Sequence, residues 1–164
     1  MILALGLNNM NEYKRIFKCR NELDTKRLAH CFSLIARKGD VFALFGTLGV
    51  GKSTFARYFI QSLTDASEVP SPTFTLVQSY DTAKFPIYHY DMYRLKYPEE
   101  AFELGVEESF FLGVNLIEWP EKIGYILPKN VWKIEIATND NIRYFTVSVC
   151  DVEKYQRLES IAYD

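Results

Sequence analysis

Cysteine is scarce in this chain of 164 residues: its three cysteines lie far apart, and no two of them form a Cys-x-x-Cys pair. An odd number of cysteines without close spacing argues against a disulfide framework and a zinc site, and favours reduced thiols. Basic residues are not in excess either, since 19 Lys and Arg stand against 21 Asp and Glu. A net charge of -2 lacks the broad basic field of a domain that binds nucleic acid unaided, so we expect any RNA to be contacted through a partner.

Long apolar runs are also missing. No segment approaches the roughly 20 apolar residues that are needed to span a bilayer. The apolar residues 1–7 have no preceding basic stretch and continue directly into 8–15 without a small-residue cleavage pattern, so we reject a signal peptide. We therefore expect a soluble, cytoplasmic protein with no membrane attachment.

The chain does have material for a packed core, because 48% of its residues are apolar and 15% are aromatic. No repeat or linker is visible, so we expect a single domain over 1–164 with a loose N-terminal segment at 1–14. Apolar runs and alternation predict strands at 15–19, 41–45, 75–80, 87–90 and 114–117, and a final hairpin of 131–137 and 143–149. The predicted helices are one capped by Asn21 and ended by Gly39, one that begins near Lys52, and a short one at 98–104.

A phosphate-binding motif stands between the predicted strand 41–45 and the helix that follows. Residues 46–53 read Gly-Thr-Leu-Gly-Val-Gly-Lys-Ser and fit the Walker A pattern at every fixed position. Glycines let the loop turn its N–H groups toward a phosphate, the helix N-terminus favours the anion, Lys52 adds a positive charge, and the Ser53 hydroxyl suits Mg²⁺. The residues expected to bind the nucleotide here are Gly46, Leu48, Gly49, Val50, Gly51, Lys52, Ser53 and Thr54.

The strand, the glycine-rich loop and the helix occur in the order that this motif requires. Together with the interleaving of further helices and strands, they predict an α/β fold. We expect a P-loop NTPase-like three-layer sandwich, with a central mostly parallel or mixed sheet, helices on both faces and a C-terminal hairpin. No Asn-Lys-x-Asp stretch is present to select guanine, so the expected cofactors are ATP and Mg²⁺.

Two acidic residues end predicted strands: Asp91 follows 87–90, and Glu118 follows 114–117. Ligands bind outside the carboxyl ends of strands in open α/β sheets, so both residues are candidates to hold Mg²⁺ or to orient the attacking water. Spacing leaves these roles open, and a surface carboxylate is the alternative for each. Thr73 follows the P-loop helix in a Pro-containing loop, where it is a candidate γ-phosphate sensor or a hydroxyl that caps the backbone.

Three further side chains, two near these acids and one distant from them, are aromatic or imidazole groups. His89 is flanked by tyrosines, and we expect it to be packed or hydrogen-bonded rather than catalytic. Trp119 directly follows Glu118, so it should lie near the site, with packing as the alternative role. Trp132 is expected in the core.

Five segments of the chain together resemble one bacterial family. They read Gly-Thr-Leu-Gly-Val-Gly-Lys-Ser-Thr (46–54), Ser-Pro-Thr-Phe-Thr-Leu-Val (71–77), Tyr-His-Tyr-Asp-Met-Tyr-Arg-Leu (88–95), Glu-Leu-Gly (103–105) and Ile-Glu-Trp-Pro-Glu (117–121). In this order they resemble the tRNA threonylcarbamoyladenosine biosynthesis ATPases TsaE, also called YjeE, over about residues 21–147. The first segment alone is generic, whereas its combination with the others is specific.

The resemblance implies an ATPase that works with a threonylcarbamoyl-transferase complex of TsaD and TsaB type, which modifies adenosine 37 of tRNA. The tRNA would be contacted indirectly, through that complex. In the family, the Walker A hydroxyl and the acid of Glu-Trp-Pro bind Mg²⁺, which here are Ser53 and Glu118. The catalytic residues expected are Lys52, Thr73, Asp91 and Glu118, and the metal ligands expected are Ser53, Asp91 and Glu118.

Other positions match the family more loosely or depart from it. Thr25 in the first helix and Arg143 in the hairpin match positions near the nucleotide. The family usually has an acidic residue directly after the first Walker glycine, where this chain has Thr47. Since the loop binds phosphate through backbone N–H groups, Thr47 leaves nucleotide binding intact, but any role of that carboxylate in turnover or partner contact does not carry over.

Nothing in the sequence resembles a well-placed arginine finger, so we expect slow hydrolysis by the isolated protein, with Arg94 and Arg143 open as contributors in cis. Two other functions stay open beside the ATPase. One is a small-molecule or nucleotide kinase, which needs an acceptor pocket and usually an Arg-rich lid. The other is a nucleotide-gated assembly module in which hydrolysis is not essential.

Overall fold

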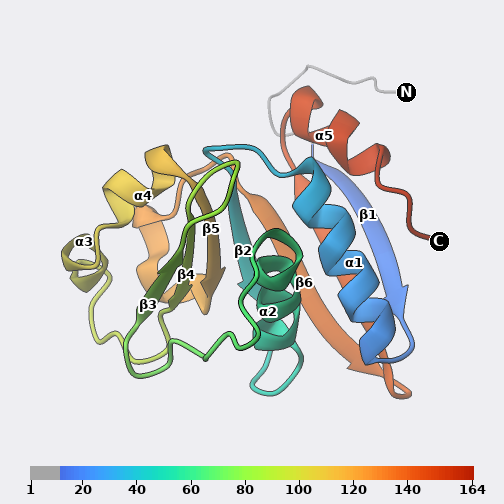
Figure 1. Ribbon diagram of the computed structural model, residues 1–164, viewed down its shortest axis with the longest axis horizontal. Helices are drawn as coiled ribbons and strands as arrows, with labels where there is room; N and C mark the ends of the chain where they lie inside the picture. The colour runs from blue at the N-terminus through green and yellow to red at the C-terminus, as the bar shows by residue number, and fades with distance from the viewer. Residues whose placement is uncertain (1–11) are drawn as a thin grey trace.

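The computed structural model describes residues 12–164, in which helices are interspersed among the strands (Figure 1). The elements are β1 (Tyr13–Cys19), α1 (Glu22–Ile35), β2 (Val41–Phe45), α2 (Lys52–Leu63), β3 (Val77–Tyr80), β4 (Ile87–Asp91), α3 (Glu100–Glu103), α4 (Val106–Leu112), β5 (Val114–Glu118), the 3₁₀ helix η1 (Pro120–Ile126), β6 (Trp132–Asn139), β7 (Ile142–Val149) and α5 (Val152–Glu159). The segment predicted to be loose at 1–14 lies mostly outside the described residues. Its last two positions, Tyr13 and Lys14, belong to β1.

The described residues form one seven-stranded sheet with the order β1-β7-β6-β2-β5-β4-β3. The pairs β6–β2, β2–β5 and β5–β4 are parallel, while β1–β7, β7–β6 and β4–β3 are antiparallel. The sheet is therefore mixed, and the predicted C-terminal hairpin is confirmed as β6 and β7. Because β2, β4 and β5 run in one direction, their carboxyl ends meet at the same edge of the sheet.

Alternate residues of a strand point to opposite faces of a sheet, so the described chain builds a core on each face. On one face, Phe42 and Leu44 of β2 pack in a core shared with α1, α2 and α5. On the other, Val41 of β2 and Ile117 of β5 pack with α3, α4 and η1. Figure 1 shows α1 and α2 side by side on one face and α3 and α4 toward the β3 edge. The predicted three-layer α/β sandwich is confirmed.

The helix boundaries follow local capping. Asn21 Oδ1 accepts a hydrogen bond from Asp24 N at 2.8 Å, as expected of an N-cap. Helix α1 ends at Ile35, before the predicted stop at Gly39, because Ala36 is already extended. The sequence reading missed α4, α5 and η1, and it placed the start of β3 two residues early. Within residues 12–164, no helix is long and apolar enough to cross a membrane.

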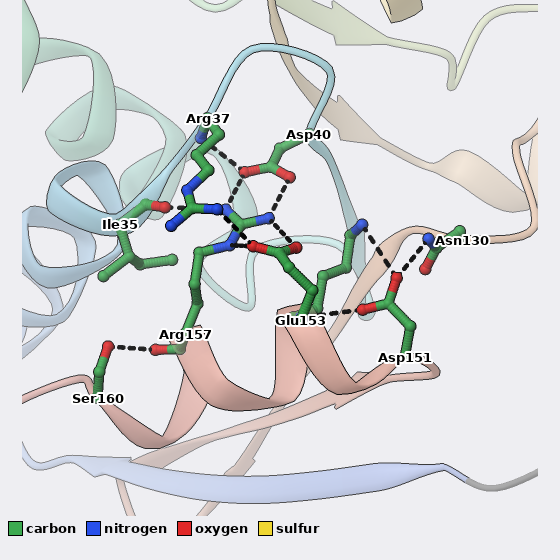
Figure 2. Close-up of polar contacts among 9 residues, drawn as sticks. Ile35, Arg37, Asp40, Asn130, Asp151, Glu153, Arg157 and Ser160 are labelled. Carbon is green, nitrogen blue, oxygen red and sulfur yellow. Dashed lines mark hydrogen bonds and ion pairs between the residues drawn. The ribbon is translucent and has the colours of Figure 1, made fainter.

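A buried ion-pair network fixes α5 to the start of β2 (Figure 2). Arg157 of α5 donates from two nitrogens to Asp40, at 2.6 and 2.9 Å. The same guanidinium donates to Glu153 at 2.6 and 2.9 Å and to the carbonyl oxygen of Ile35 at 2.8 Å. Asp40 also accepts from the backbone N–H of Arg37 at 2.7 Å. This network lies at the end of β2 opposite the Walker A loop, so it supports the scaffold from the far edge.

Candidate functional site

The Walker A loop joins the end of β2 to the start of α2, and its glycines hold conformations that other residues rarely adopt. Gly46 has φ of 152°, and a Cβ added there would lie 2.6 Å from Val50 Cγ1 and 2.8 Å from the carbonyl oxygen of Ile136. Gly51 has φ of 122° and caps α2, with the Arg143 guanidinium 3.3 Å from where a Cβ would be. Glycine is therefore favoured at both positions. At Gly46 a side chain would clash with neighbouring residues, and at Gly51 it would crowd the guanidinium of Arg143.

Lys52 is the first residue of α2 and is buried, with 4% exposure. Its ammonium donates to the carbonyl oxygens of Gly46 and, at 3.1 Å, Thr47, so it folds back across the loop. The same nitrogen lies 3.9 Å from the centroid of the Trp119 ring, within the range of a cation–π contact. Burial lowers the pKa of Lys52, and three nearby carboxylates oppose that shift. The loop thus holds a cation at the centre of its concave side.

Ser53 and Glu118 form the next contact, one residue further along α2. Ser53 Oγ donates to Glu118 Oε1 at 2.8 Å. Glu118 ends β5 and is 2% exposed, and its other oxygen, Oε2, lies 2.7 Å from Nε2 of His89. The prediction that Glu118 emerges at the carboxyl edge of the sheet is confirmed, and His89 is hydrogen-bonded as expected.

Asp91 lies beside Glu118, because the two residues are partners in the parallel register of β4 and β5. Its Oδ2 accepts from the Thr73 hydroxyl at 3.1 Å, and its Oδ1 accepts from the backbone N–H of Tyr93 at 3.0 Å. The Thr73 hydroxyl also lies 2.7 Å from that of Ser71, so its contacts are to side chains and not to the backbone. The structure therefore brings the loop after α2 to the same edge as the two acids.

These groups surround a cavity of about 190 Å³. Its lining consists of Leu48, Gly49, Gly51, Lys52, Ser53, Thr54, Thr73, Asp91, Glu118 and Trp119. Most of the residues predicted for nucleotide, metal and catalysis thus meet in one place. Of the predicted loop residues, Gly46 and Val50 form the side of the loop that faces the protein, where Val50 is buried in the core.

A second cavity, of about 370 Å³, meets the first at Gly49, which lines both. Its lining consists of Cys19, Arg20, Asn21, Glu22, Gly49, Thr138, Asn141 and Arg143. The structure thus places Arg143 beside the Walker A loop, while its contact with a nucleotide stays a prediction. Thr25 is fully buried in α1, and a buried hydroxyl offers no surface to a ligand in this structure. Its contact with a nucleotide stays a prediction.

Two contacts of the site were missed by sequence reasoning. Lys52 and Trp119 stack although they are far apart in the sequence, and no motif spacing predicts this contact. Trp119 also has φ of 59°, a left-handed value that is uncommon outside glycine and asparagine. The bond between His89 and Glu118 was missed as well, although His89 lies two residues before Asp91 on the same strand, and that spacing points both side chains to one face.

The donor set of the site fits a magnesium nucleotide. Mg²⁺ in nucleotide sites takes hard oxygen ligands, usually one or two carboxylates together with phosphate oxygens and water. Ser53, Glu118 and Asp91 supply such oxygens at one edge, next to the ammonium of Lys52. In the described part of the chain, no cluster of three or more His, Cys, Asp or Glu side chains could hold a metal ion.

Known proteins are similar to this chain in sequence and in architecture. The model of the family described as Threonylcarbamoyl adenosine biosynthesis protein TsaE matches residues 19–145. The tRNA threonylcarbamoyladenosine biosynthesis protein TsaE of Rickettsia felis is 41% identical over 121 residues, which cover 73% of this chain and 71% of that protein. The protein of the same name in Bacillus subtilis is 39% identical over 117 residues, or 71% of this chain and 73% of the relative.

A solved structure agrees with the sequence matches. The crystal structure of Bacillus subtilis YdiB superposes with a TM-score of 0.78 and 29% identity, over 92% of this chain and 95% of that chain. The likeness therefore extends over most of both chains. Because the family match covers most of the chain and relatives above 30% identity align over more than two thirds of it, the chain belongs to the TsaE family of threonylcarbamoyl adenosine biosynthesis proteins.

Proposed function

We propose that this chain is a Mg-dependent P-loop ATPase of the cytoplasm that is required for threonylcarbamoyladenosine at position 37 of tRNA. It acts on a partner threonylcarbamoyl-transferase complex of TsaD and TsaB type and meets tRNA through that complex. The observation that carries the proposal is the contact of Ser53 Oγ with Glu118 Oε1 at 2.8 Å, directly beside the Lys52 ammonium at the start of α2. The biosynthetic role rests on the names of the relatives.

The Walker A loop and α2 would bind the phosphates. The first four N–H groups of a helix have no partner within the helix, and the helix dipole adds partial positive charge at that end. Helix α2 has no side-chain cap at Gly51, so its N-terminal amides are free of a competing carboxylate or hydroxyl cap. Lys52 adds a full charge. Its present acceptors are the carbonyl oxygens of Gly46 and Thr47, which are weaker partners than a phosphate dianion.

Ser53 and Glu118 would hold the magnesium ion, which when bound neutralises phosphate charge and orients the attacked phosphoryl group. Asp91 is the neighbour of Glu118 in the register, and its two bonds, from Thr73 and from the N–H of Tyr93, keep its carboxylate in place. Such an arrangement allows Asp91 to hold a metal-bound water or to orient the attacking one. Positioning and charge stabilisation supply most of the catalysis in phosphoryl transfer.

The second cavity would take the nucleoside. It continues from the phosphate site at Gly49, and its volume of about 370 Å³ lies in the range of small-molecule sites. Arg143 lies between the two cavities, against Gly51. Of the two arginines considered for a contribution in cis, it is the one beside the Walker A loop, whereas the guanidinium carbon of Arg94 lies 5.0 Å from the centroid of the Phe74 ring. Any arginine contribution in cis would come from Arg143, and without an arginine finger from a partner, hydrolysis by the isolated protein would be slow.

The loop between α2 and β3 would report the nucleotide state to the partner. Thr73 in this loop is bonded to Asp91, and the next residue, Phe74, is 82% exposed. A phosphate or metal that competes for Asp91 or Thr73 changes the position of the loop, and the exposed ring moves with it. A ligand changes a conformation through such a difference in contacts between two states.

The test combines binding, turnover and tRNA modification. Wild-type protein should bind Mg-ATP in preference to Mg-GTP, release phosphate slowly alone and faster with the partner complex, and support threonylcarbamoylation in a reconstituted reaction. Glu118→Ala should still bind ATP but lose phosphate release and tRNA modification. Full tRNA modification by Glu118→Ala would mean that binding alone suffices and that the protein is an assembly module. A phosphorylated small-molecule acceptor in place of free phosphate would identify a kinase.

A further inference from the structure

His89 occupies a costly position for a histidine. It lies on β4 with 1% exposure, and its Nδ1 is buried with no hydrogen-bond partner among the described residues. An unpaired polar atom in the interior is destabilising, and an apolar side chain would fill a strand position between Ile87 and Asp91 without that cost. Its one side-chain bond is the 2.7 Å contact of Nε2 with Glu118 Oε2. A role in that contact accounts for the presence of an imidazole here.

The strand register directs His89 at Glu118. Residues 89 and 91 of β4 point to the same face of the sheet, because side chains alternate along a strand. In the parallel pairing, Asp91 is opposite Glu118 and His89 is opposite Leu116. His89 therefore reaches Glu118 along the diagonal, from the interior side, while Asp91 lies at the open edge. Glu118 is therefore bonded to His89 on its interior side and to Ser53 on the side of the cavity.

The two oxygens of Glu118 have separate partners. Oε2 faces His89 Nε2 at 2.7 Å, and Oε1 accepts from Ser53 Oγ at 2.8 Å. A carboxylate accepts hydrogen bonds, so Nε2 carries the proton in this contact. A hydrogen bond to one oxygen restricts the rotation of a carboxylate, so the other oxygen favours one direction. Partners behind a metal ligand orient it in this way, and their loss typically lowers metal affinity about 10- to 100-fold.

We propose that His89 is a positioning residue that holds Glu118 through Oε2 and so presents Oε1, beside the Ser53 hydroxyl, to the divalent cation of a bound nucleotide. The proposal rests on the proposed function of Mg-nucleotide binding. It assigns His89 no contact with nucleotide or cation, so its effect must pass through Glu118.

The test uses three variants of His89 and measures ATP affinity by calorimetry over a series of free Mg²⁺ concentrations. His89→Gln places an amide N–H at about the reach of Nε2, whereas the shorter His89→Asn does not, and His89→Leu has no donor. His89→Asn and His89→Leu should raise, by about tenfold, the Mg²⁺ concentration at which the enhancement of ATP affinity is half-maximal. Both should leave the affinity for ATP in EDTA within about twofold, and His89→Gln should restore most of the Mg²⁺ response.

A double variant tests the route of the effect. His89→Asn combined with Glu118→Gln should respond to Mg²⁺ no differently from Glu118→Gln alone, since residues that act through one contact are not additive. Equal Mg²⁺ responses in His89→Asn and wild type would overturn the proposal, as would a parallel loss of affinity with and without Mg²⁺ accompanied by a lower melting temperature. Wild-type protein that binds ATP without any Mg²⁺ enhancement would instead refute the proposed function, and the inference with it.

Discussion

The two ends of strand β2 both place charged side chains in the protein interior, but they use them differently. At the amino end, Asp40 accepts three hydrogen bonds, two from Arg157 and one from the backbone of Arg37. The guanidinium of Arg157 has five N–H donors, and five contacts, to Asp40, Glu153 and Ile35, use them (Figure 2). The donors of Arg157 are saturated and Asp40 has three partners, so the charges at this end serve the fold.

At the carboxyl end, the charges have spare capacity. Glu118 and Asp91 each have two hydrogen-bond partners among the described residues, while an ionised carboxylate has about four acceptor positions. Within residues 12–164, Lys52 is bonded only to neutral carbonyl oxygens and to a ring face. These groups line a cavity. Buried charge at the amino end is paired within the fold, whereas buried charge at the carboxyl end has room for a ligand.

The largest expected effect lies at the saturated end. Arg157→Met removes one partner of a buried ion pair and leaves the Asp40 carboxylate uncompensated, which typically costs about 3–5 kcal/mol. Urea unfolding should show this loss in the free energy of unfolding. Calorimetry on the folded fraction should give wild-type affinity for Mg-ATP.

A matched double variant sharpens this prediction. Asp40→Asn combined with Arg157→Met removes both charges, so it should be less destabilised than the sum of the single variants. Additive losses would mean that the pair contributes no interaction of its own. A loss of Mg-ATP affinity in the folded Arg157→Met protein would show that the two ends of β2 are not independent.

The next effect belongs to the functional end. Lys52→Ala removes the cation in the Walker A loop, and truncation of a buried, charge-paired group costs about 2–5 kcal/mol of binding free energy. Affinity for Mg-ATP should fall by about 100-fold or more in calorimetry. Because burial lowers the pKa of Lys52 and so disfavours its charged form, the free energy of unfolding without nucleotide should not fall. A large loss of stability would indicate that Lys52 is structural, like Arg157.

How far the sequence predicts each end follows from the range of the interactions. The Walker A loop was predictable because its motif consists of consecutive residues of fixed types. Glu118 and Asp91 were predictable as strand ends at one edge. The pairing of Asp40 with Arg157 was not, since it joins residues 117 positions apart, and α5 itself was missed because its sequence from Val152 to Glu159 is short and mostly polar.

The functional end also contains features that spacing does not encode. Trp119 stacks on Lys52 from a left-handed backbone conformation, directly before Pro120. His89 reaches Glu118 because of the β4–β5 register, and register is set by the whole sheet rather than by either strand. Local motifs therefore identify the phosphate loop, while the second layer of contacts around it requires the fold.

A smaller effect is expected at the cap of α5. Asp151 Oδ1 accepts from Lys154 N at 2.7 Å, and replacement of such an N-cap by Ala costs about 1 kcal/mol. Burial alone raises the pKa of Asp151, but hydrogen bonds from Lys154 N and Asn130 outweigh it and lower the pKa below 3.8. A carboxyl whose pKa is lower in the folded state stabilises the protein above its unfolded pKa and loses that contribution as the pH falls through the folded value.

The check on this cap is urea unfolding of Asp151→Ala and Asp151→Ser at pH 7 and near pH 3. The difference between wild type and Asp151→Ala should shrink in acid, because protonation weakens the cap of the wild type. Asp151→Ser keeps a hydroxyl cap that does not titrate, so its stability relative to Asp151→Ala should change little with pH. A pH-independent advantage of wild type over both variants would contradict the assignment.

The smallest effect on binding is expected for tryptophan substitutions, which report on the two ends separately. The chain has two tryptophans: Trp119 lies beside Lys52, and Trp132 lies under Arg157 with 5.1 Å from the guanidinium carbon to the ring centroid. Trp119→Phe should abolish the fluorescence response to Mg-ATP, with affinity changed only a few-fold. Trp132→Phe should keep the response. A fluorescence response that is lost in Trp132→Phe and kept in Trp119→Phe would place the nucleotide at the amino end of β2, which would contradict the proposed site.

Isothermal calorimetry of wild-type protein with ATP and magnesium shows whether the carboxyl end of β2 binds the ligand for which its charges have spare capacity. We expect one saturable site per chain, with heat that is lost in Lys52→Ala. Folded protein that shows neither heat nor affinity for Mg-ATP would contradict this expectation.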